Sequence, residues 1–406
     1  MLTLKKILIN YKDVFLLGLI AIIIGLIVGT IETVFGKVLL EVTNIRSNHV
    51  FLLTPFLPVA GILIAFTYSK IGKNSIKGMS LIFSAGFDEK ETIPKRLVPL
   101  AMVSTWITHL FGGSAGREGV AVQIGGTVGH AVGRKLGLKD NKSKILLITG
   151  MAAGFAGLFH TPLAAIFFAM ELLTAGVVEY SALFPCIIAA FVANYTSLAL
   201  GLEKSVVNLN CSLELNVYLI LKIVLLGILF GIIGGLFAYA LNFSKKFFSK
   251  SISNPILRIF IMGCILSVLF LLLHKGRYSG LGSNLITAAF SNGKVYGYDW
   301  ILKFILTILT LSVGFQGGEV TPLFSIGASL GAIIAPIFGL PIEFVAALGY
   351  VALFGSGTNT ILAPIFIGGE IFGFDYLPHF FVVSSIAYVF NGNKSIYSSQ
   401  KILNNF

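Results

Sequence analysis

The chain has 406 residues, which is long enough for two or three soluble domains, but its composition excludes that class of protein. Hydrophobic residues make up 56% of the chain and charged residues only 11%, against about 25% charged in soluble domains. A formal net charge of +12 is compatible with nucleic-acid binding in a soluble chain, but here the charge has another explanation. Basic residues gather in short segments that connect apolar runs, which is typical of the positive-inside rule and favours a cytoplasmic N-terminus. These residues are Lys5, Lys6, Lys12, Lys70, Lys73, Lys77, Arg134, Lys135, Lys139, Lys142, Lys144, Lys245, Lys246 and Lys250.

Eight charge-free apolar runs of 18 residues or more follow one another along the chain. They are Val14–Ile31, Val50–Ser69, Leu97–Gly116, Ile145–Met170, Tyr180–Leu202, Ile223–Ser244, Val320–Ile342 and Phe344–Gly369. Because an α-helix needs about 20 apolar residues to cross a bilayer, the runs predict an all-α, multi-pass membrane protein whose surroundings are lipid.

Three of these apolar runs contain residues that interrupt helices. The interruptions are Gly112–Gly116, His160–Pro162 and Gly355–Thr360. Non-helical backbone at membrane depth is tolerated only where protein buries it or where it lines a water-filled cavity. The interruptions therefore indicate a path for a substrate.

An internal repeat links the two halves of the chain. Thr161–Leu172 and Thr360–Ile371 are identical at six of twelve positions without a gap. We predict one transmembrane domain, residues 1–406, with a first repeat at about 10–205 and a second at about 212–392. The polar stretch Glu203–Glu214 joins them. Duplicated halves with broken helices are a common plan among transporters.

The segment Gly116-Arg117-Glu118-Gly119 places two charges between an apolar run and a glycine-rich helix. If Gly119 opens that helix, its N-terminus offers free N–H groups and a positive dipole end to an anion. Glu118 can occupy such a position itself when ionised, and protonation would free the position for another anion. A structural Arg117–Glu118 ion pair at the membrane edge explains the same residues equally well.

The segment Gly317–Pro322 is the counterpart in the second half. Two glycines followed by a proline describe a helix that opens from an unwound segment, with free N–H groups at Glu319 and Val320. The hydroxyl of Thr321 can donate to an anion or to Glu118. An ordinary helix cap with an exposed Glu319 is the alternative, and the residues alone slightly favour it.

These two motifs and the duplicated halves resemble the CLC family of anion channels and proton-coupled anion antiporters. The resemblance covers residues 14 to about 400 and implies a homodimer with one anion pathway per subunit, built from two inverted repeats. It implies that Glu118 is the gating glutamate, which competes with the anion and carries the proton. The residues that it places around the anion are Gly116, Arg117, Gly119, Glu319, Val320, Thr321 and the pore tyrosine, Tyr397.

Three departures from the chloride-transporting members resemble the fluoride-specific branch of that family. Val120 follows the gating motif instead of proline, and Met79 stands where a serine hydroxyl would hold chloride. Leu172 stands where an internal proton-carrying glutamate is expected. The resemblance implies a fluoride/proton antiporter of the bacterial inner membrane, without a cofactor and without a C-terminal regulatory domain. A chloride/proton antiporter and a passive anion channel remain as alternatives.

Other polar residues within the apolar runs have simpler interpretations. Glu171 and Glu370 occupy equivalent repeat positions, which favours a structural role over a proton path. His109 and His160 lack the spacing of metal ligands, so we expect packing roles and no metal site. No H-E-x-x-H motif or phosphate-binding loop is found, and Phe354–Gly357 lacks the first glycine of an intramembrane serine protease motif. We therefore predict a transporter, neither an enzyme nor a nucleic-acid-binding protein.

Overall fold

The structure is a computed structural model that describes residues 2–88, 90–138, 141–203, 207, 209, 211, 213–291 and 293–402. Side chains are described from Tyr11 onward. Lys139 and six residues of the connecting stretch Glu203–Glu214 lie outside the described residues, as do the side chains of Lys5 and Lys6.

The described chain is mostly helical, as the apolar runs predict. Its helices are α1 (Leu2–Asn48), α2 (Val50–Leu53), α3 (Leu57–Thr67), α4 (Met79–Phe87), α5 (Leu97–Leu110), α6 (Glu118–Lys135), α7 (Asn141–Phe159), α8 (Pro162–Leu172), α9 (Leu183–Ala199), α10 (Val217–Ser251), α11 (Pro255–Leu272), α12 (Ser283–Phe290), α13 (Asp299–Ser312), α14 (Val320–Phe338), α15 (Ile342–Thr358), α16 (Leu362–Phe372) and α17 (Leu377–Val389). Two short strands, β1 (Thr174–Ala175) and β2 (Lys401–Ile402), pair in parallel, which the sequence did not predict.

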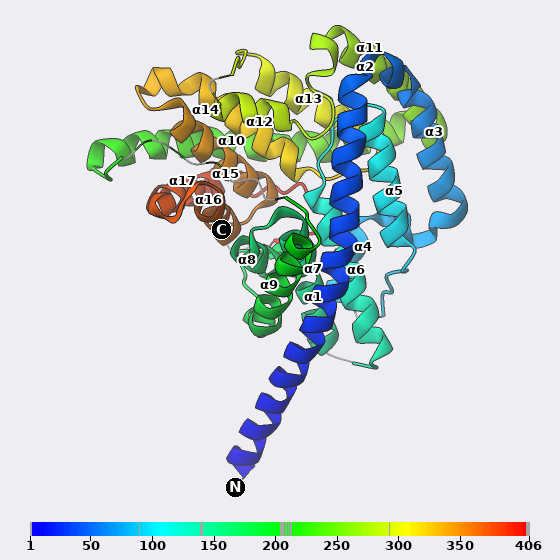
Figure 1. Cartoon of the computed structure of the whole chain (residues 1–406), viewed down its shortest axis with the longest axis vertical. Helices are drawn as coiled ribbons and strands as arrows, with labels where there is room; N and C mark the ends of the chain where they lie inside the picture. The colour runs from blue at the N-terminus through cyan, green and yellow to red at the C-terminus, as the bar shows by residue number, and fades with distance from the viewer. Residues whose placement is uncertain are drawn as a thin grey trace.

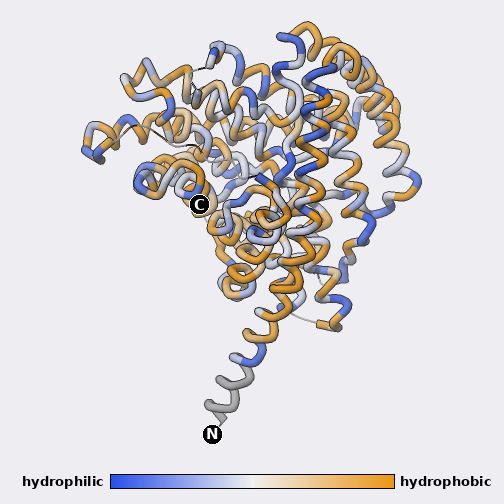
Figure 2. The backbone as a smooth tube through the Cα atoms, in the orientation of Figure 1, coloured by the Kyte–Doolittle hydropathy of each residue, from blue (hydrophilic) through white to orange (hydrophobic). Residues whose placement is uncertain are grey.

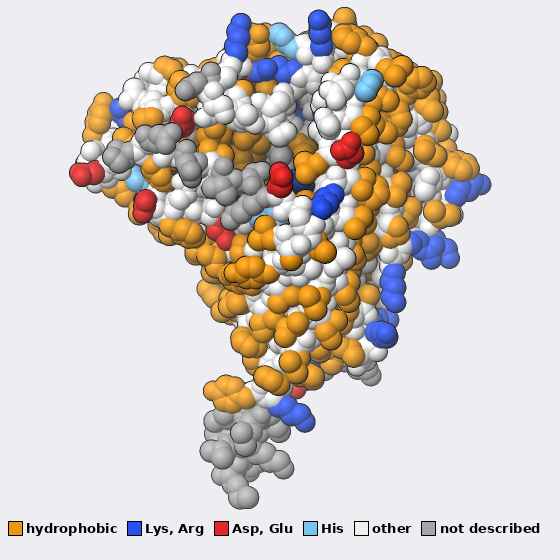
Figure 3. All heavy atoms as spheres, in the orientation of Figure 1, with side chains coloured by type: hydrophobic (Ala, Val, Ile, Leu, Met, Phe, Trp, Pro, Cys, Tyr) orange, Lys and Arg blue, Asp and Glu red, His pale blue; other side chains and the backbone are white. Residues whose placement is uncertain are grey.

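The helices form one body, with the amino-terminal end of α1 projecting from it (Figure 1). In Figure 1 helix α1 runs through the middle of the view, and it packs against α9 and α7. Seven stretches of helix among the described residues are long and apolar enough to cross a membrane. Apolar residues dominate the helices, and polar residues are frequent at their ends and in the loops (Figure 2). Orange hydrophobic side chains cover much of the right and lower sides of the surface, as a lipid environment requires (Figure 3).

The repeat appears as two helix pairs that pack unusually closely, α6 with α7 and α14 with α15. In the first pair Gly125 and Gly150 face each other, so that a Cβ atom on either would overlap the other's carbonyl oxygen. In the second pair Gly327 and Gly349 make the same contact. Small residues at a crossing allow membrane helices to approach backbone to backbone. The same glycine-to-glycine contact occurs at equivalent places in the two halves, which supports the internal repeat.

Glu171 and Glu370 also have equivalent surroundings, which confirms the structural role that their repeat positions favoured. The Glu370 carboxylate accepts hydrogen bonds from the N–H groups of Leu163 (3.0 Å) and Ala164 (2.9 Å), in the first turn of α8. Glu171 accepts from the N–H groups at the start of α16, including that of Leu362 at 3.0 Å. Each glutamate therefore caps the short helix that carries the other, and each carboxylate faces the positive end of a helix dipole.

Two of the three predicted interruptions lie where expected, and the third is shorter. Helix α5 ends before Gly112–Gly116, and α7 ends at Phe159, just before His160–Pro162. The third prediction was wrong for residues 355–358, which continue α15 up to Thr358. The break begins at Asn359, whose left-handed backbone (φ 58°) ends the helix. Glycine content alone does not stop a helix that is buried on all sides.

Replacing Glu370 by glutamine should destabilise the fold by about 1–2 kcal/mol, because the helix N-terminus loses its charged acceptor. Thermal unfolding of the purified protein in detergent measures this change. The matched control is Glu41→Gln, which removes a carboxylate from an exposed position of α1. An unchanged unfolding temperature for Glu370→Gln would contradict the capping role.

Candidate functional site

The amino-terminal ends of α6 and α14 meet near the centre of the protein. Gly116 and Gly318, which precede these helices, exchange backbone hydrogen bonds of 2.5 and 2.7 Å in an antiparallel bridge. Gly318 has no Cβ atom, and one placed there would lie 2.9 Å from the amide nitrogen of Gly119. Since the two segments occupy equivalent repeat positions and run in opposite directions, they agree with the inverted repeats that the resemblance implies.

Glu118 is the first residue of α6, and its carboxylate lies on the amino-terminal end of α14. The side chain is only 1% exposed. Its Oε2 atom accepts hydrogen bonds from the Thr321 N–H group (3.1 Å), from the Thr321 hydroxyl and from the Arg117 N–H group (3.3 Å). A carboxylate therefore occupies the place that a helix N-terminus offers to an anion.

Arg117 contacts the same carboxylate, so both sequence interpretations of the charged pair describe the structure. Its Nε atom lies 3.5 Å from Oε1 of Glu118. That distance is too long for a strong hydrogen bond, and Nε and Nη1 are buried with no hydrogen-bond acceptor among the described residues. The pair is thus electrostatic and leaves Glu118 held mainly by Thr321.

Glu319 and Val320 begin α14, and their N–H groups donate to no acceptor within the described part of the chain. The side chain of Glu319 is only 12% exposed, so the alternative of an exposed cap was wrong. It faces a cavity and forms a 3.3 Å ion pair with Lys245 of α10. A partner from a helix about seventy residues away in sequence gives no local signal, which is why the sequence did not predict this burial.

A cavity of about 280 Å³ lies on one side of the α6–α14 meeting point, and we name it the Tyr397 cavity. Met79, the first residue of α4, lines it together with Gly119, Glu319 and Tyr397, whereas Val320 does not. The Tyr397 hydroxyl is buried without a hydrogen-bond partner among the described residues. The structure therefore brings together four of the residues that the resemblance placed around an anion.

A second cavity, of about 540 Å³, lies on the other side, and we name it the Tyr350 cavity. Arg117, Glu118 and Thr321 line it together with Tyr350. Because Glu118 and Thr321 border this cavity and Gly119 and Glu319 border the other, the contact between Glu118 and Thr321 lies between the two cavities.

His109 supports the segment that precedes Glu118, in keeping with its expected packing role. One ring nitrogen lies 2.8 Å from the carbonyl oxygen of Thr105 and the other lies 3.0 Å from that of Ala115. His160 likewise contacts a polar side chain, Asn194, at 3.0 Å. No group of three or more His, Cys, Asp or Glu side chains in the described ranges is arranged to hold a metal ion.

Sequence reasoning missed Glu32, which lies in the middle of α1. Its carboxyl group is fully buried, and neither oxygen has a hydrogen-bond partner among the described residues. Arg117 acts on it electrostatically, so the guanidinium lies in the field of two carboxyl groups, Glu32 and Glu118. A signal existed, because an acidic residue inside a membrane helix is a functional candidate by default. The charge-free run that predicts this helix stops at Ile31, one residue before Glu32, whereas α1 itself continues to Asn48.

Comparisons with known proteins agree with this architecture. The family model described as "Voltage gated chloride channel" matches residues 60–392. A "Chloride/fluoride channel protein" from Pseudomonas syringae pv. tomato is 35% identical over 386 residues, which cover 94% of this chain and 85% of that relative. The crystal structure of a CLC-type fluoride/proton antiporter is 51% identical, with a TM-score of 0.95 over 97% of this chain and 99% of that chain. A cyanobacterial Cl⁻/H⁺ antiporter, 21% identical, shares the fold, with a TM-score of 0.83 over 94% of this chain and 96% of that chain.

Proposed function

The chain belongs to the CLC family of anion channels and transporters, and we propose that it is a fluoride/proton antiporter that exports fluoride across the bacterial plasma membrane. The observation that carries the proposal is the Glu118 carboxylate on the N–H and hydroxyl groups of Thr321. A protonatable group that occupies an anion position can couple the two ions, because only one of them is bound there at a time. The similarity to a fluoride/proton antiporter at 51% identity supports fluoride as the anion.

The gating step follows from the chemistry of a carboxyl group. Ionised, Glu118 presents full negative charge to the α14 N-terminus and accepts several hydrogen bonds. Protonated, it is neutral and no longer gains from the helix dipole, so an anion competes successfully for the same donors. The departing side chain carries its proton with it. Gly116 and Gly119 lie on either side of Arg117 and Glu118 in the chain, and Arg117 places a positive charge beside the Glu118 carboxylate.

Fluoride is small and strongly hydrated, so its site must replace water with N–H and O–H donors. The free N–H groups of Glu319 and Val320 and the Thr321 hydroxyl provide such donors at the start of α14. Tyr397 adds a buried hydroxyl without a partner in the described chain. Met79, which lines the same cavity as Tyr397, has a thioether and no donor. Met79, Glu319 and Tyr397 are the proposed lining of the anion path on the Tyr397 side, and Thr321 is its proposed border with the Tyr350 cavity.

The alternatives on the same fold are a chloride/proton antiporter and a passive anion channel. Met79 disfavours chloride, since the donor that the chloride-transporting members use is absent. The buried carboxylate at Glu118 favours a coupled transporter over an open channel, because it fills the path between the two cavities. The family resemblance supports a homodimer in the lipid bilayer with one anion pathway per subunit.

Ion efflux from proteoliposomes tests the proposal. Vesicles are loaded with fluoride or with chloride, and ion-selective electrodes record the release after the membrane potential is collapsed. We expect fast fluoride release with little chloride release, relative to protein-free vesicles. Comparable rates for the two anions would point to a general CLC transporter, and no release of either anion by folded protein would contradict a transport function.

Replacing Met79 by serine should raise chloride efflux about tenfold, because the hydroxyl restores one hydrogen bond to the larger anion, and such a bond contributes about 1.5 kcal/mol. The ratio of chloride to fluoride efflux in the same vesicles measures the change. Met79→Leu is the matched control, since it removes the sulfur without adding a donor. Equal chloride efflux from the two variants would show that Met79 does not set the selectivity.

A further inference from the structure

A third cavity, of about 520 Å³, lies where the end of α1 meets the chain that precedes α12. We name it the Arg46 cavity. None of the described residues that line it is an aspartate or a glutamate, and its basic members are Arg46, His274, Lys275 and Arg277. A concave site lined by one sign of charge concentrates ions of the opposite sign.

Arg46 is a buried basic residue of this cavity whose charge is not balanced by a described carboxylate. The residue is only 6% exposed, and its guanidinium forms no hydrogen bond or ion pair with any described residue. A buried charge without a partner is costly, and an arginine carries five N–H donors that require acceptors. The guanidinium fits because the neighbouring loop has a glycine, Gly280, where a Cβ atom would lie 3.0 Å from Nη2.

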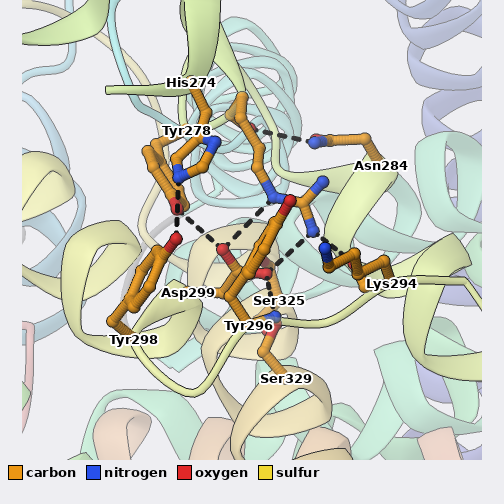
Figure 4. Close-up of polar contacts among 10 residues, drawn as sticks. His274, Tyr278, Asn284, Lys294, Tyr296, Tyr298, Asp299, Ser325 and Ser329 are labelled. Atoms are coloured by element: carbon orange, nitrogen blue, oxygen red, sulfur yellow. Dashed lines mark hydrogen bonds and ion pairs between the residues drawn. The ribbon is translucent and has the colours of Figure 1, made fainter. Parts of the chain in front are cut away.

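Asp299, an acidic residue that contacts the cavity residues Arg277 and Tyr296, is already occupied by these and other partners (Figure 4). Asp299 accepts a paired contact from Arg277, with distances of 3.2 Å to Nε and 2.8 Å to Nη2. It also accepts from the Tyr278 hydroxyl (2.7 Å) and from the Tyr296 N–H group (2.9 Å). Arg277 is thus paired with Asp299, so Arg46 and Lys275 are the arginine and lysine of the lining that have no carboxylate partner among the described residues.

A second buried basic side chain, that of Lys303, lies beside Arg46. Lys303 of α13 is fully buried, and its Nζ atom donates to Ser114 Oγ (2.9 Å) and to the carbonyl oxygens of Tyr278 (3.2 Å) and Gly280 (2.7 Å). All three acceptors are neutral. Gly280 links the two side chains, because its carbonyl oxygen accepts from Lys303 and its Cα faces Nη2 of Arg46, and no described carboxylate pairs with either basic residue.

Two hydroxyl groups complete a set of unpaired donors. Ser279 and Thr43 both line the Arg46 cavity, and their side-chain oxygens are buried without a hydrogen-bond partner in the described chain. Ser47 lines the same cavity but differs, because its hydroxyl donates to the Thr43 carbonyl oxygen at 2.8 Å. Three unpaired donors from two segments that are distant in sequence therefore border one acid-free cavity.

We propose that the Arg46 cavity is a second anion site, which holds fluoride or chloride between the Arg46 guanidinium and the hydroxyls of Ser279 and Thr43. Hydrogen bonds from a charged donor and two hydroxyls suit a small inorganic anion. Ser283 borders both this cavity and the Tyr350 cavity, which contains Glu118. The site thus lies beside the transport path, and its contribution to fluoride transport rests on the proposed function, whereas anion binding itself does not.

Calorimetric titration of the purified, full-length protein with sodium fluoride and with sodium chloride tests the binding. The variant Ser279→Ala with Thr43→Val removes the two hydroxyls without burying a new charge, and Ser47→Ala is the matched control. We expect the double variant to lose one class of anion sites or to weaken it at least tenfold, while the control retains wild-type binding. An isotherm of the double variant that equals the wild type would overturn the proposal.

Fluoride efflux from proteoliposomes separates this proposal from the proposed function. If both hold, the double variant transports fluoride with unchanged proton coupling but needs at least about tenfold more fluoride for half-maximal rate. If the protein does not transport fluoride, wild type and variant are both silent in this assay, and the calorimetric comparison still decides whether the cavity binds anions.

Discussion

Replacing Glu118 by glutamine is expected to abolish proton transport, reducing it to the level of protein-free vesicles. Glutamine has nearly the shape of glutamate and still accepts hydrogen bonds from Thr321, but it neither binds a proton at neutral pH nor carries charge. The carboxylate is 1% exposed and lies between the two cavities, so no other group at that point can exchange protons with the anion position. Fluoride movement, if it persists, becomes independent of the proton gradient.

Simultaneous recording of fluoride release and of pH inside proteoliposomes measures this loss of coupling. The matched control is Glu41→Gln, which removes an exposed carboxylate of α1 that lines neither cavity. This control should retain wild-type coupling. Proton movement by Glu118→Gln at a wild-type rate would show that the proton uses another group, and Glu32 would be the first to examine, since it is buried near Arg117.

Replacing Gly125 by valine should prevent the protein from folding. A Cβ atom at this position overlaps the Gly150 carbonyl oxygen, which belongs to the backbone of α7 and cannot rotate away. Overpacking of a core ordinarily costs about 1–3 kcal/mol, and a branched side chain in a backbone contact should exceed that range. The only relief is to separate α6 from α7, and this would also displace Glu118 at the start of α6.

Size-exclusion chromatography of the detergent-solubilised protein and thermal unfolding measure the result. Gly297→Val is the matched control, because a Cβ atom at Gly297 meets nothing within 4 Å. We expect the control to behave as wild type and Gly125→Val to yield aggregated protein. Folded Gly125→Val protein with a wild-type unfolding temperature would mean that the close approach of α6 and α7 does not hold the site together.

The sequence predicted the features that arise from local pattern. Apolar runs predicted the helices, and the resemblance to the CLC family, confirmed by the comparisons, rested on motifs at Gly116–Gly119 and Gly317–Pro322. The sequence offered two acceptors for the Thr321 hydroxyl, an anion or Glu118, and in the structure it donates to Glu118. The repeat positions of Glu171 and Glu370 predicted a shared structural role, although not that each glutamate caps the other's helix.

Features that depend on distant partners could not be predicted in this way. Glu319 pairs with Lys245, which lies on a helix that is distant in sequence. Arg46 borders a cavity whose other wall is formed by residues 274–284, more than two hundred residues further along the chain. The continuation of α15 through Gly355–Thr358 reflects tertiary burial, which overrides the helix-breaking tendency of glycine. Such effects of packing between segments have no counterpart in the periodicity of one segment.

The most direct test of the central claim, exchange of fluoride for protons through Glu118, is the direction of proton movement during fluoride efflux. Proteoliposomes are loaded with fluoride at equal inner and outer pH, and the membrane potential is collapsed with potassium and valinomycin. We predict that fluoride efflux acidifies the lumen, because protons enter as fluoride leaves. Leakage of hydrogen fluoride carries protons outward and raises the luminal pH, so protein-free vesicles give the opposite sign. Fluoride efflux through the protein without acidification of the lumen would contradict the antiporter and indicate a passive channel.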